Sequence, residues 1–254
     1  MRILRSIKLA VQNAQFRVWQ RRHPGATFKD YFASIVRNDI QTRRMHPTLG
    51  ENLRDGTFGQ IGRATFKNLL SFGIKPDDVC VDYGCGTLRV GVHAMRFLNP
   101  GRYWGLDIDQ SLLDTGARLV GSELIAEKQP RLRVISPETV KEAAESKPAF
   151  LFSVAVLIHV HPAELDEYLR NILAIVSGSG TALVAGKWSD DKTYQLSRQS
   201  WAHSLPGMRE MLDPLGARVR VVSENESRPA KHGYKGGIRG GVLEIRSYRS
   251  ERLG

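Results

Sequence analysis

The sequence contains little cysteine and no long run of hydrophobic residues. Two cysteines occur among 254 residues, and no apolar run approaches the roughly 18 residues that a membrane-spanning helix needs. The N-terminus also lacks the apolar core and small-residue cleavage site of a secretory signal peptide. These absences argue against a disulfide-stabilised secreted scaffold, and we expect a cytoplasmic protein with reduced thiols.

Several ligand-binding motifs are missing as well. No Cys/His spacing is that of a structural zinc site, so we expect no metal. No Gly-Lys-Ser or Gly-Lys-Thr follows a glycine-rich turn, which excludes a P-loop. The dinucleotide fingerprint needs a third glycine where this chain has Arg89, and this disfavours nicotinamide and flavin cofactors.

Acidic residues are scarce near the N-terminus. Residues 1–75 contain 14 Lys and Arg against four Asp and Glu, so nearly all of the net charge of +11 resides there. Such asymmetry predicts an extension that meets something anionic. We therefore divide the chain into a basic, helical N-terminal extension over residues 1–58 and a single larger domain over residues 59–254.

The extension begins with a predicted basic amphipathic helix. Its apolar stripe repeats at steps of three and four: Ile3, Ile7, Val11, Ala14 and Val18. The stripe could pack on the domain or on a second subunit of an oligomer. It could instead lie in an anionic membrane surface with Phe16 and Trp19 as anchors, making the protein peripheral at the membrane. A cleavable targeting segment and a nucleic-acid contact are further alternatives.

The most informative segment is residues 79–87, Val-Cys-Val-Asp-Tyr-Gly-Cys-Gly-Thr. A short apolar run ends in Asp82 and turns at Gly84 and Gly86, as a buried parallel strand does when it enters a helix around a bound nucleotide. Glycine lacks a Cβ, so a ligand can lie against the main chain there. A second short strand ends in Asp107, whose carboxylate can accept hydrogen bonds from both ribose hydroxyls of an adenosine.

From residue 79 onward, apolar patterns predict alternating strands and helices, which is typical of a doubly wound α/β sheet. Helices are expected near residues 3–19, 29–38 and 59–71, and further helices start at Thr87, Gln110, Pro137, Pro162 and about Lys192. Seven strands are expected near Val79–Asp82, Tyr103–Asp107, Leu132–Ile135, Leu151–Val154, Ala182–Ala185, Arg218–Ser223 and Val242–Ser247.

These motifs resemble those of the class I S-adenosylmethionine-dependent methyltransferases. The family's first motif, an acid followed by Gly-x-Gly, matches residues 82–86, and its second, a Gly-hydrophobic-Asp strand end, matches residues 105–107. The resemblance implies a Rossmann-like, seven-stranded, mostly parallel sheet with an antiparallel last strand, and S-adenosylmethionine as cofactor. The cofactor-binding residues that it implies are Asp82, Gly84, Cys85, Gly86, Asp107, Ile108 and Ser153.

Methyl transfer to a hydroxyl needs a base, and histidine is the usual choice near neutral pH. His159 and His161 follow the fourth predicted strand, at the sheet edge where ligands bind. His159 is the candidate base and His161 a weaker candidate. The alternatives are a structural loop histidine for His159 and a helix-capping residue for His161. Cys85 is interpreted as a small residue that fits the turn, and Asp82 either caps the turn or serves the methionine end of the cofactor.

The acceptor is inferred from charge and from the histidines. We expect O-methylation of a small-molecule or glycan-type acceptor, anionic or membrane-linked. Alternatives are an RNA methyltransferase and a non-catalytic S-adenosylmethionine-binding protein. Nucleic acid is disfavoured, because residues 153–155 carry neither an Asn-Pro-Pro-Tyr type signature nor a Pro-Cys nucleophile. The glycine-rich segment from Lys231 to Gly241 is either a flexible hairpin or a loop that grips an anionic group.

Overall fold

The computed structural model describes residues 13–43, 59–224 and 237–248. Five strands form the parallel part of the central sheet, in the order β3-β2-β1-β4-β5. They are β1 (Cys80–Tyr83), β2 (Tyr103–Asp107), β3 (Arg131–Val134), β4 (Phe150–Val154) and β5 (Thr181–Ser189). All five match predicted strands. The first three predicted stripe residues of the extension, Ile3, Ile7 and Val11, lie outside the described residues.

The last two predicted strands complete the sheet beside β5. They are β8 (Ala217–Glu224) and β9 (Ile238–Ser247), and β9 runs antiparallel to both β5 and β8. The predicted seven-stranded, mostly parallel sheet with an antiparallel last strand is therefore confirmed. Most of the glycine-rich segment falls in residues 225–236, outside the described residues, between these two strands.

Two further strands occupy the place of the helix that we predicted near Lys192, so that prediction is wrong. The strands β6 (Tyr194–Ser197) and β7 (Ser200–Ser204) form a hairpin, and β7 pairs in parallel with the far end of β5. The helix begins later, as α9 (Leu205–Leu212). Ser204 caps it by accepting a hydrogen bond from the Gly207 N–H, with proline in the first turn. This Ser-Leu-Pro signal is the better predictor of the helix start.

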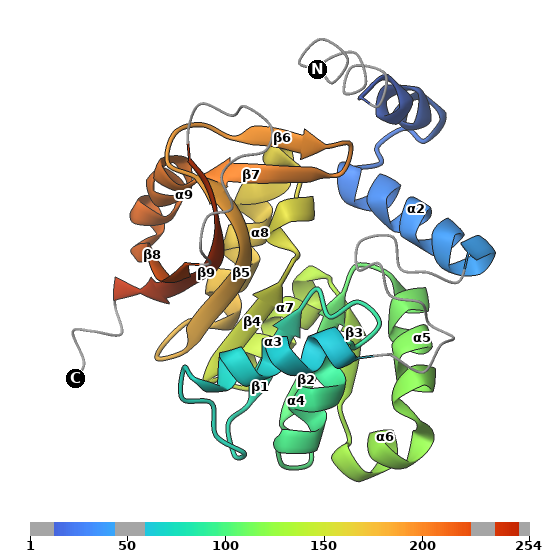
Figure 1. Ribbon diagram of the computed structural model, residues 1–254, viewed down its shortest axis with the longest axis vertical. Helices are drawn as coiled ribbons and strands as arrows, with labels where there is room; N and C mark the ends of the chain where they lie inside the picture. The colour runs from blue at the N-terminus through green and yellow to red at the C-terminus, as the bar shows by residue number, and fades with distance from the viewer. Residues whose placement is uncertain (1–12, 44–58, 225–236, 249–254) are drawn as a thin grey trace.

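Helices cover both faces of the sheet (Figure 1). On one face α3 (Gln60–Leu70), α4 (Gly91–Phe97), α5 (Gln110–Val120) and α6 (Ser122–Lys128) pack around one hydrophobic cluster. On the other face α7 (Pro137–Glu145), α8 (Leu165–Ile175) and α9 pack around a second cluster. Neighbouring strand residues alternate between the clusters, with Val81 in one and Cys80 in the other. This alternation is what a strand buried on both faces requires.

The segment after the glycine turn differs from the prediction at its start. The helix expected from Thr87 begins at Gly91, because residues 87–90 form a turn in which Leu88 has a φ of 64°. Leucine rarely adopts this left-handed conformation. Within the described part of the chain, no helix combines the length and apolar character that crossing a membrane would take.

The extension contributes two described helices, residues 13–22 and α2 (Phe28–Arg43), drawn in blue at the upper right of Figure 1. Phe16 and Trp19 pack inward against an aromatic cluster built on Phe28, Tyr31 and Trp201. Ala14 and Val18 of the predicted stripe are instead exposed. The helix over residues 13–22 thus packs through its aromatic side chains rather than through the predicted aliphatic stripe, because the surface that it contacts is itself aromatic.

Candidate functional site

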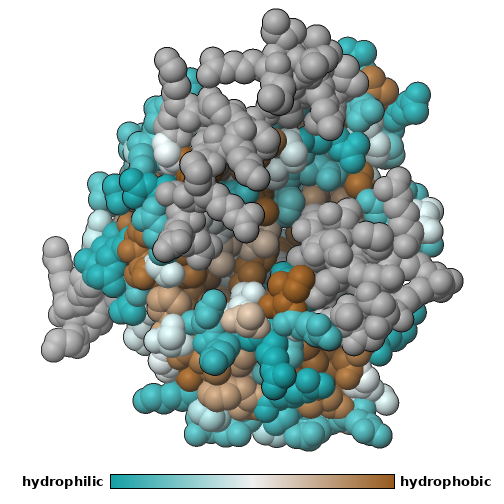
Figure 2. Space-filling model, in the orientation of Figure 1, coloured by the Kyte–Doolittle hydropathy of each residue, from teal (hydrophilic) through white to brown (hydrophobic). Residues whose placement is uncertain are grey.

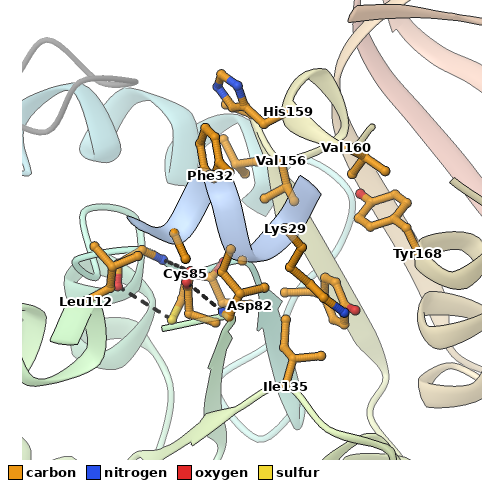
Figure 3. Close-up of a pocket in the computed structure, with 18 of the residues that line it drawn as sticks. Lys29, Phe32, Asp82, Cys85, Leu112, Ile135, Val156, His159, Val160 and Tyr168 are labelled. Atoms are coloured by element: carbon orange, nitrogen blue, oxygen red, sulfur yellow. Dashed lines mark hydrogen bonds between the residues drawn. The ribbon is translucent and has the colours of Figure 1, made fainter. Parts of the chain in front are cut away.

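One pocket lies where the carboxyl ends of β1, β2 and β4 meet α2 (Figure 3). This is the edge of an open α/β sheet at which ligands bind. The lining includes Lys29, Phe32, Ala33 and Val36 of α2; residues 82–86, Arg89 and Val90; Asp107, Ile108, Leu112 and Ile135; residues 154–156, His159 and Val160; and Glu164, Glu167, Tyr168 and Asn171. In the space-filling view, hydrophobic surface is visible in the central hollow and the periphery is mostly hydrophilic (Figure 2).

The glycine turn at the base of the pocket has no room for a side chain. Gly84 has a φ of 81°, and a Cβ there would lie 2.3 Å from Cγ2 of Val156. Gly86 has a φ of 56°, and its N–H donates a 2.7 Å hydrogen bond to Oδ2 of Asp107. This hydrogen bond holds the turn against Asp107 at the end of β2. The main chain of the turn is therefore positioned to contact a bound nucleotide.

Asp107 keeps capacity for a ligand. Its two oxygens accept from the main-chain N–H groups of Gly86 and Ile108, and a hydrogen bond from the Asp109 N–H also lowers its pKa. The two carboxylate oxygens have about four acceptor positions in all, so capacity for a ribose hydroxyl remains. Burial raises the pKa of Asp107 to about 6, against the opposing effect of the N–H groups. The carboxylate form thus predominates at neutral pH.

Asp82 is buried at the end of β1 and is 2% exposed. Its Oδ2 accepts a 2.9 Å hydrogen bond from the Tyr103 hydroxyl. Burial raises its pKa to about 7, and the nearby Arg89 acts in the opposite direction. A buried carboxylate that faces a pocket in this way favours a cationic partner such as an ammonium group. This is the role that the family resemblance implies for the methionine end of the cofactor.

Cys85 and Ser153, the remaining predicted cofactor residues, differ in their placement. Cys85 lines the pocket, and burial holds the pKa of its thiol well above the ordinary value, which leaves it a poor nucleophile. Ser153 is buried outside the pocket lining. Its hydroxyl donates to the Tyr83 carbonyl and accepts from the Tyr168 hydroxyl, both at 2.9 Å. Its side chain therefore serves the packing of two residues that do line the pocket.

His159, at the end of the 3-10 turn η1 (Leu157–His159), lines the pocket. Its Nδ1 lies 2.5 Å from the carbonyl oxygen of Gln199, so Nδ1 carries the proton and donates it. The Nε2 atom is buried with no hydrogen-bond partner among the described residues. The ring stacks on Phe32 at 5.0 Å between centroids, and burial lowers the histidine pKa. The arrangement presents a neutral imidazole with a free lone pair.

His161 is not among the residues that line the pocket. Its Nδ1 accepts a hydrogen bond from the Ala163 N–H at the start of the 3-10 turn η2 (Pro162–Glu164). Its ring packs against Phe28 and Trp201. His161 is therefore the helix-capping residue that we gave as its alternative role. His159 remains the candidate base.

Sequence reasoning missed the contribution of α2. Two sets of contacts fasten this helix over the pocket. At one end Lys29 pairs with Glu167 at 3.0 Å, and the Lys29 N–H donates to Glu164. Further along, Arg37 pairs with Asp109, which also caps α5. A helix was predicted near residues 29–38, but no local signal indicated that it covers the pocket.

The fold is that of the S-adenosylmethionine-dependent methyltransferases. No protein-family model matches the chain. Magnesium protoporphyrin IX methyltransferase from Synechocystis PCC 6803, solved with bound S-adenosylmethionine, superposes with a TM-score of 0.57 at 15% sequence identity over 88% of this chain and 99% of that chain.

Two further solved structures bear on how far the fold alone specifies activity. A 1,6-didemethyltoxoflavin-N1-methyltransferase from Burkholderia thailandensis, solved with its substrate and S-adenosylhomocysteine, has a TM-score of 0.51 and 18% identity over 88% of this chain and 92% of that one. A [4+2]-cyclase has a TM-score of 0.55 and 14% identity over 78% of this chain and 85% of that one. Because one fold serves both reactions, the activity must be argued from the site.

The residues around the pocket fit S-adenosylmethionine. At Gly84 a Cβ would collide with Val156, so the turn is open only to a bare main chain. Asp107 lies beside the turn and can offer its carboxylate to the ribose, and Asp82 offers a buried carboxylate to an ammonium group. Ile108, Leu112 and Ile135 add apolar lining beyond Asp107, where an adenine would lie. These residues thus match the ribose hydroxyls and the ammonium group of this cofactor.

Proposed function

We propose that the protein transfers a methyl group from S-adenosylmethionine to a hydroxyl of a small-molecule acceptor, with His159 as general base. The finer expectations from the sequence are a glycan-type acceptor, and one that is anionic or membrane-linked. When bound, the cofactor supplies a methyl group on a sulfonium sulfur. His159 Nε2 takes the hydroxyl proton while the oxygen bonds to the methyl carbon and the sulfur keeps the electron pair of the broken bond.

The observation that carries this proposal is the hydrogen bond that fixes the ring of His159 in the wall of the pocket. Its Nδ1 proton is committed to the Gln199 carbonyl, so the lone pair resides on the buried Nε2. A neutral imidazole held in one tautomer is what a general base requires. Burial lowers the pKa of His159, so the base stays neutral below the ordinary histidine range.

Replacing His159 tests the proposal. We expect His159→Ala to lower kcat by about 10² or more while the dissociation constant for S-adenosylmethionine stays nearly unchanged, as for loss of a base. In the wild type, kcat should fall only when the pH drops through the lowered pKa of His159. The pH-rate profile of the variant should lack this fall on the acid side. Calorimetry and a pH-rate profile measure the two quantities. Equal rates in both proteins would contradict the assignment.

We further infer that the extension contacts an anionic membrane surface through the exposed face of the helix over residues 13–22. Val18 is 47% exposed, and Arg17, Arg21 and Arg22 are also exposed. An apolar residue flanked by cations suits an interfacial position. Phe16 and Trp19, the membrane anchors expected from the sequence, pack instead in the aromatic cluster. The membrane contact would therefore use the face of the helix opposite to these two residues.

A further inference from the structure

The part of the pocket farther from the cofactor motifs has walls that are mostly hydrophobic. Phe32 and Val36 come from α2, Val156 and Val160 flank η1, and Tyr168 comes from α8. In Figure 3, Phe32, Val156, Val160 and Tyr168 are drawn on the His159 side of Asp82 and Cys85. Val36 is 1% exposed and Tyr168 is 5% exposed, whereas Phe32, Val156 and Val160 are partly exposed.

Tyr83, from the turn motif, and Tyr168 each use their hydroxyl group in a hydrogen bond within the protein. The Tyr83 hydroxyl accepts a 3.1 Å hydrogen bond from Asn171, and the Tyr168 hydroxyl donates a 2.9 Å hydrogen bond to Ser153. The rings meet edge to face at 5.7 Å between centroids. The tyrosines therefore offer aromatic carbon to the cavity. The His159 ring lines the pocket, and its buried Nε2 has no hydrogen-bond partner among the described residues.

The cations that line the pocket, as far as the structure describes it, have carboxylates beside them. Lys29 pairs with Glu167, and Arg89 lies close enough to Asp82 to oppose the rise in its pKa. Lys29 and Arg89 are the cations among the described lining residues. A carboxylate or phosphate on the acceptor would have to share one of these cations with a carboxylate that already offsets its charge. The lining also includes Asp107, Glu164 and Glu167, so a further buried anion there is costly.

We propose that the acceptor binds beneath α2 and is an uncharged, largely apolar hydroxyl compound, such as a phenol, whose hydroxyl meets Nε2 of His159. The inference rests on the proposed function and specifies its substrate class. A ring or hydrocarbon body replaces water along the apolar walls. A glycan would bury several hydroxyls against hydrocarbon with few partners, so it fits this surface poorly.

Binding to the protein saturated with S-adenosylhomocysteine tests the substrate class without requiring turnover. The probes are 2-naphthol, 6-hydroxy-2-naphthoate, methyl glucoside and glucose 6-phosphate, with affinities from calorimetry. We expect 2-naphthol to bind about tenfold or more tighter than its carboxylated analogue, and the sugars to show no detectable binding. Tighter binding of the carboxylate or of either sugar, or no binding of 2-naphthol, would overturn the inference.

A substitution on α2 tests the location. Ala33 lines the pocket and is 7% exposed, so Ala33→Leu should fill the subsite and weaken 2-naphthol binding about tenfold while S-adenosylhomocysteine affinity holds. The matched control Asn38→Leu, on the exposed side of the same helix, should change neither affinity. Unchanged naphthol binding by a folded Ala33→Leu protein would place the subsite elsewhere.

A second variant tests the location if the Ala33→Leu protein does not fold. Val36→Thr keeps the shape of the wall but places a hydroxyl in it, and it should also weaken 2-naphthol binding. Unchanged binding by this variant would likewise contradict the inference. If the protein methylated sugars in preference to phenols, the substrate class would be wrong while the methyltransferase proposal stood. If the protein failed to bind S-adenosylmethionine, the methyltransferase proposal itself would fail.

Discussion

Among single residues, Asp82 links the chemistry of the site to the stability of the fold. Its raised pKa means that, between about pH 4 and pH 7, the folded state holds a proton that the unfolded chain has released. The stabilisation from this proton is complete at low pH and is lost as the pH rises through 7. At neutral and higher pH the buried carboxylate therefore lowers the free energy of unfolding.

Asp82→Asn should remove this penalty, since the amide oxygen can still accept from the Tyr103 hydroxyl. At pH 8 we expect the variant to be more stable than the wild type, by on the order of 2–4 kcal/mol. Near pH 4 the difference should vanish, and S-adenosylmethionine affinity should fall at every pH. Urea unfolding at the two pH values measures the effect.

Asp109→Asn is a control in which the free energy of unfolding should change in the opposite direction. Burial raises the pKa of Asp109, but hydrogen bonds from Arg37 and Ser111 outweigh it and hold the pKa below the ordinary value. This variant should therefore lose stability at pH 8. A stability difference for Asp82→Asn that is the same at both pH values would contradict the account.

The glycines and acids of the site were predictable because their roles are set within a few residues. Gly84, Gly86 and Asp107 lie where a short strand ends, and each strand end is recognisable from its own segment. Phe32 and Gln199 were not predictable, because they act on His159 from helices and turns far away in the sequence. His159 itself was identified from its place after a strand, but its tautomer depends on those distant partners.

At the level of elements, α2 is held by a small aromatic core of its own. Phe28 is 4% exposed and contacts Tyr31, His161 and Trp201, with ring centroids between 5.0 and 5.8 Å apart. This cluster is separate from the two clusters of the sheet. The extension can therefore loosen while the sheet remains folded.

Phe28→Ala should release α2 from the domain. Truncating a buried phenylalanine costs about 3–5 kcal/mol, and we expect that loss to appear locally, as faster hydrogen exchange over residues 13–43 with little change in β1 or β4. Thr42→Ala, at the exposed end of the same helix, is the control and should exchange as the wild type does. Uniformly faster exchange over the whole sheet would contradict a separate docking core.

The sheet and its helices were largely predictable and the β6–β7 hairpin was not. Alternating apolar runs bounded by glycine and proline repeat along the parallel part, so each strand is visible by itself. Residues 194–204 mix polar and apolar side chains, and β7 is buried because it continues the sheet at the end of β5. That pairing is a tertiary contact that the local pattern does not contain.

For the whole molecule, deletion of residues 1–22 distinguishes the two roles of the extension. The deletion removes Phe16 and Trp19 from the aromatic cluster and breaks the reciprocal amide pair between Asn13 and Gln195. We expect the melting temperature to fall by roughly 5 °C or more, with S-adenosylmethionine binding retained. A melting curve identical to that of the full chain would show that this helix contributes no packing.

The membrane contact has its own measurement. Replacing Arg17, Arg21 and Arg22 with Gln should leave the melting temperature unchanged, because these side chains are exposed. Co-sedimentation with anionic vesicles should weaken, and the wild-type binding should fall as salt is added. Equal vesicle binding by the two proteins would contradict a membrane role for this face.

The contacts of the extension also decide when the protein can finish folding during synthesis. Asn13 and Gln195 are 182 positions apart, and Lys29 and Glu167 are 138 apart. The ribosome delivers the first helices long before these partners, so the helices can dock on the domain only after the partners have been synthesised. The wall that α2 gives to the pocket is consequently completed late, after Glu164 and Glu167 have joined the chain.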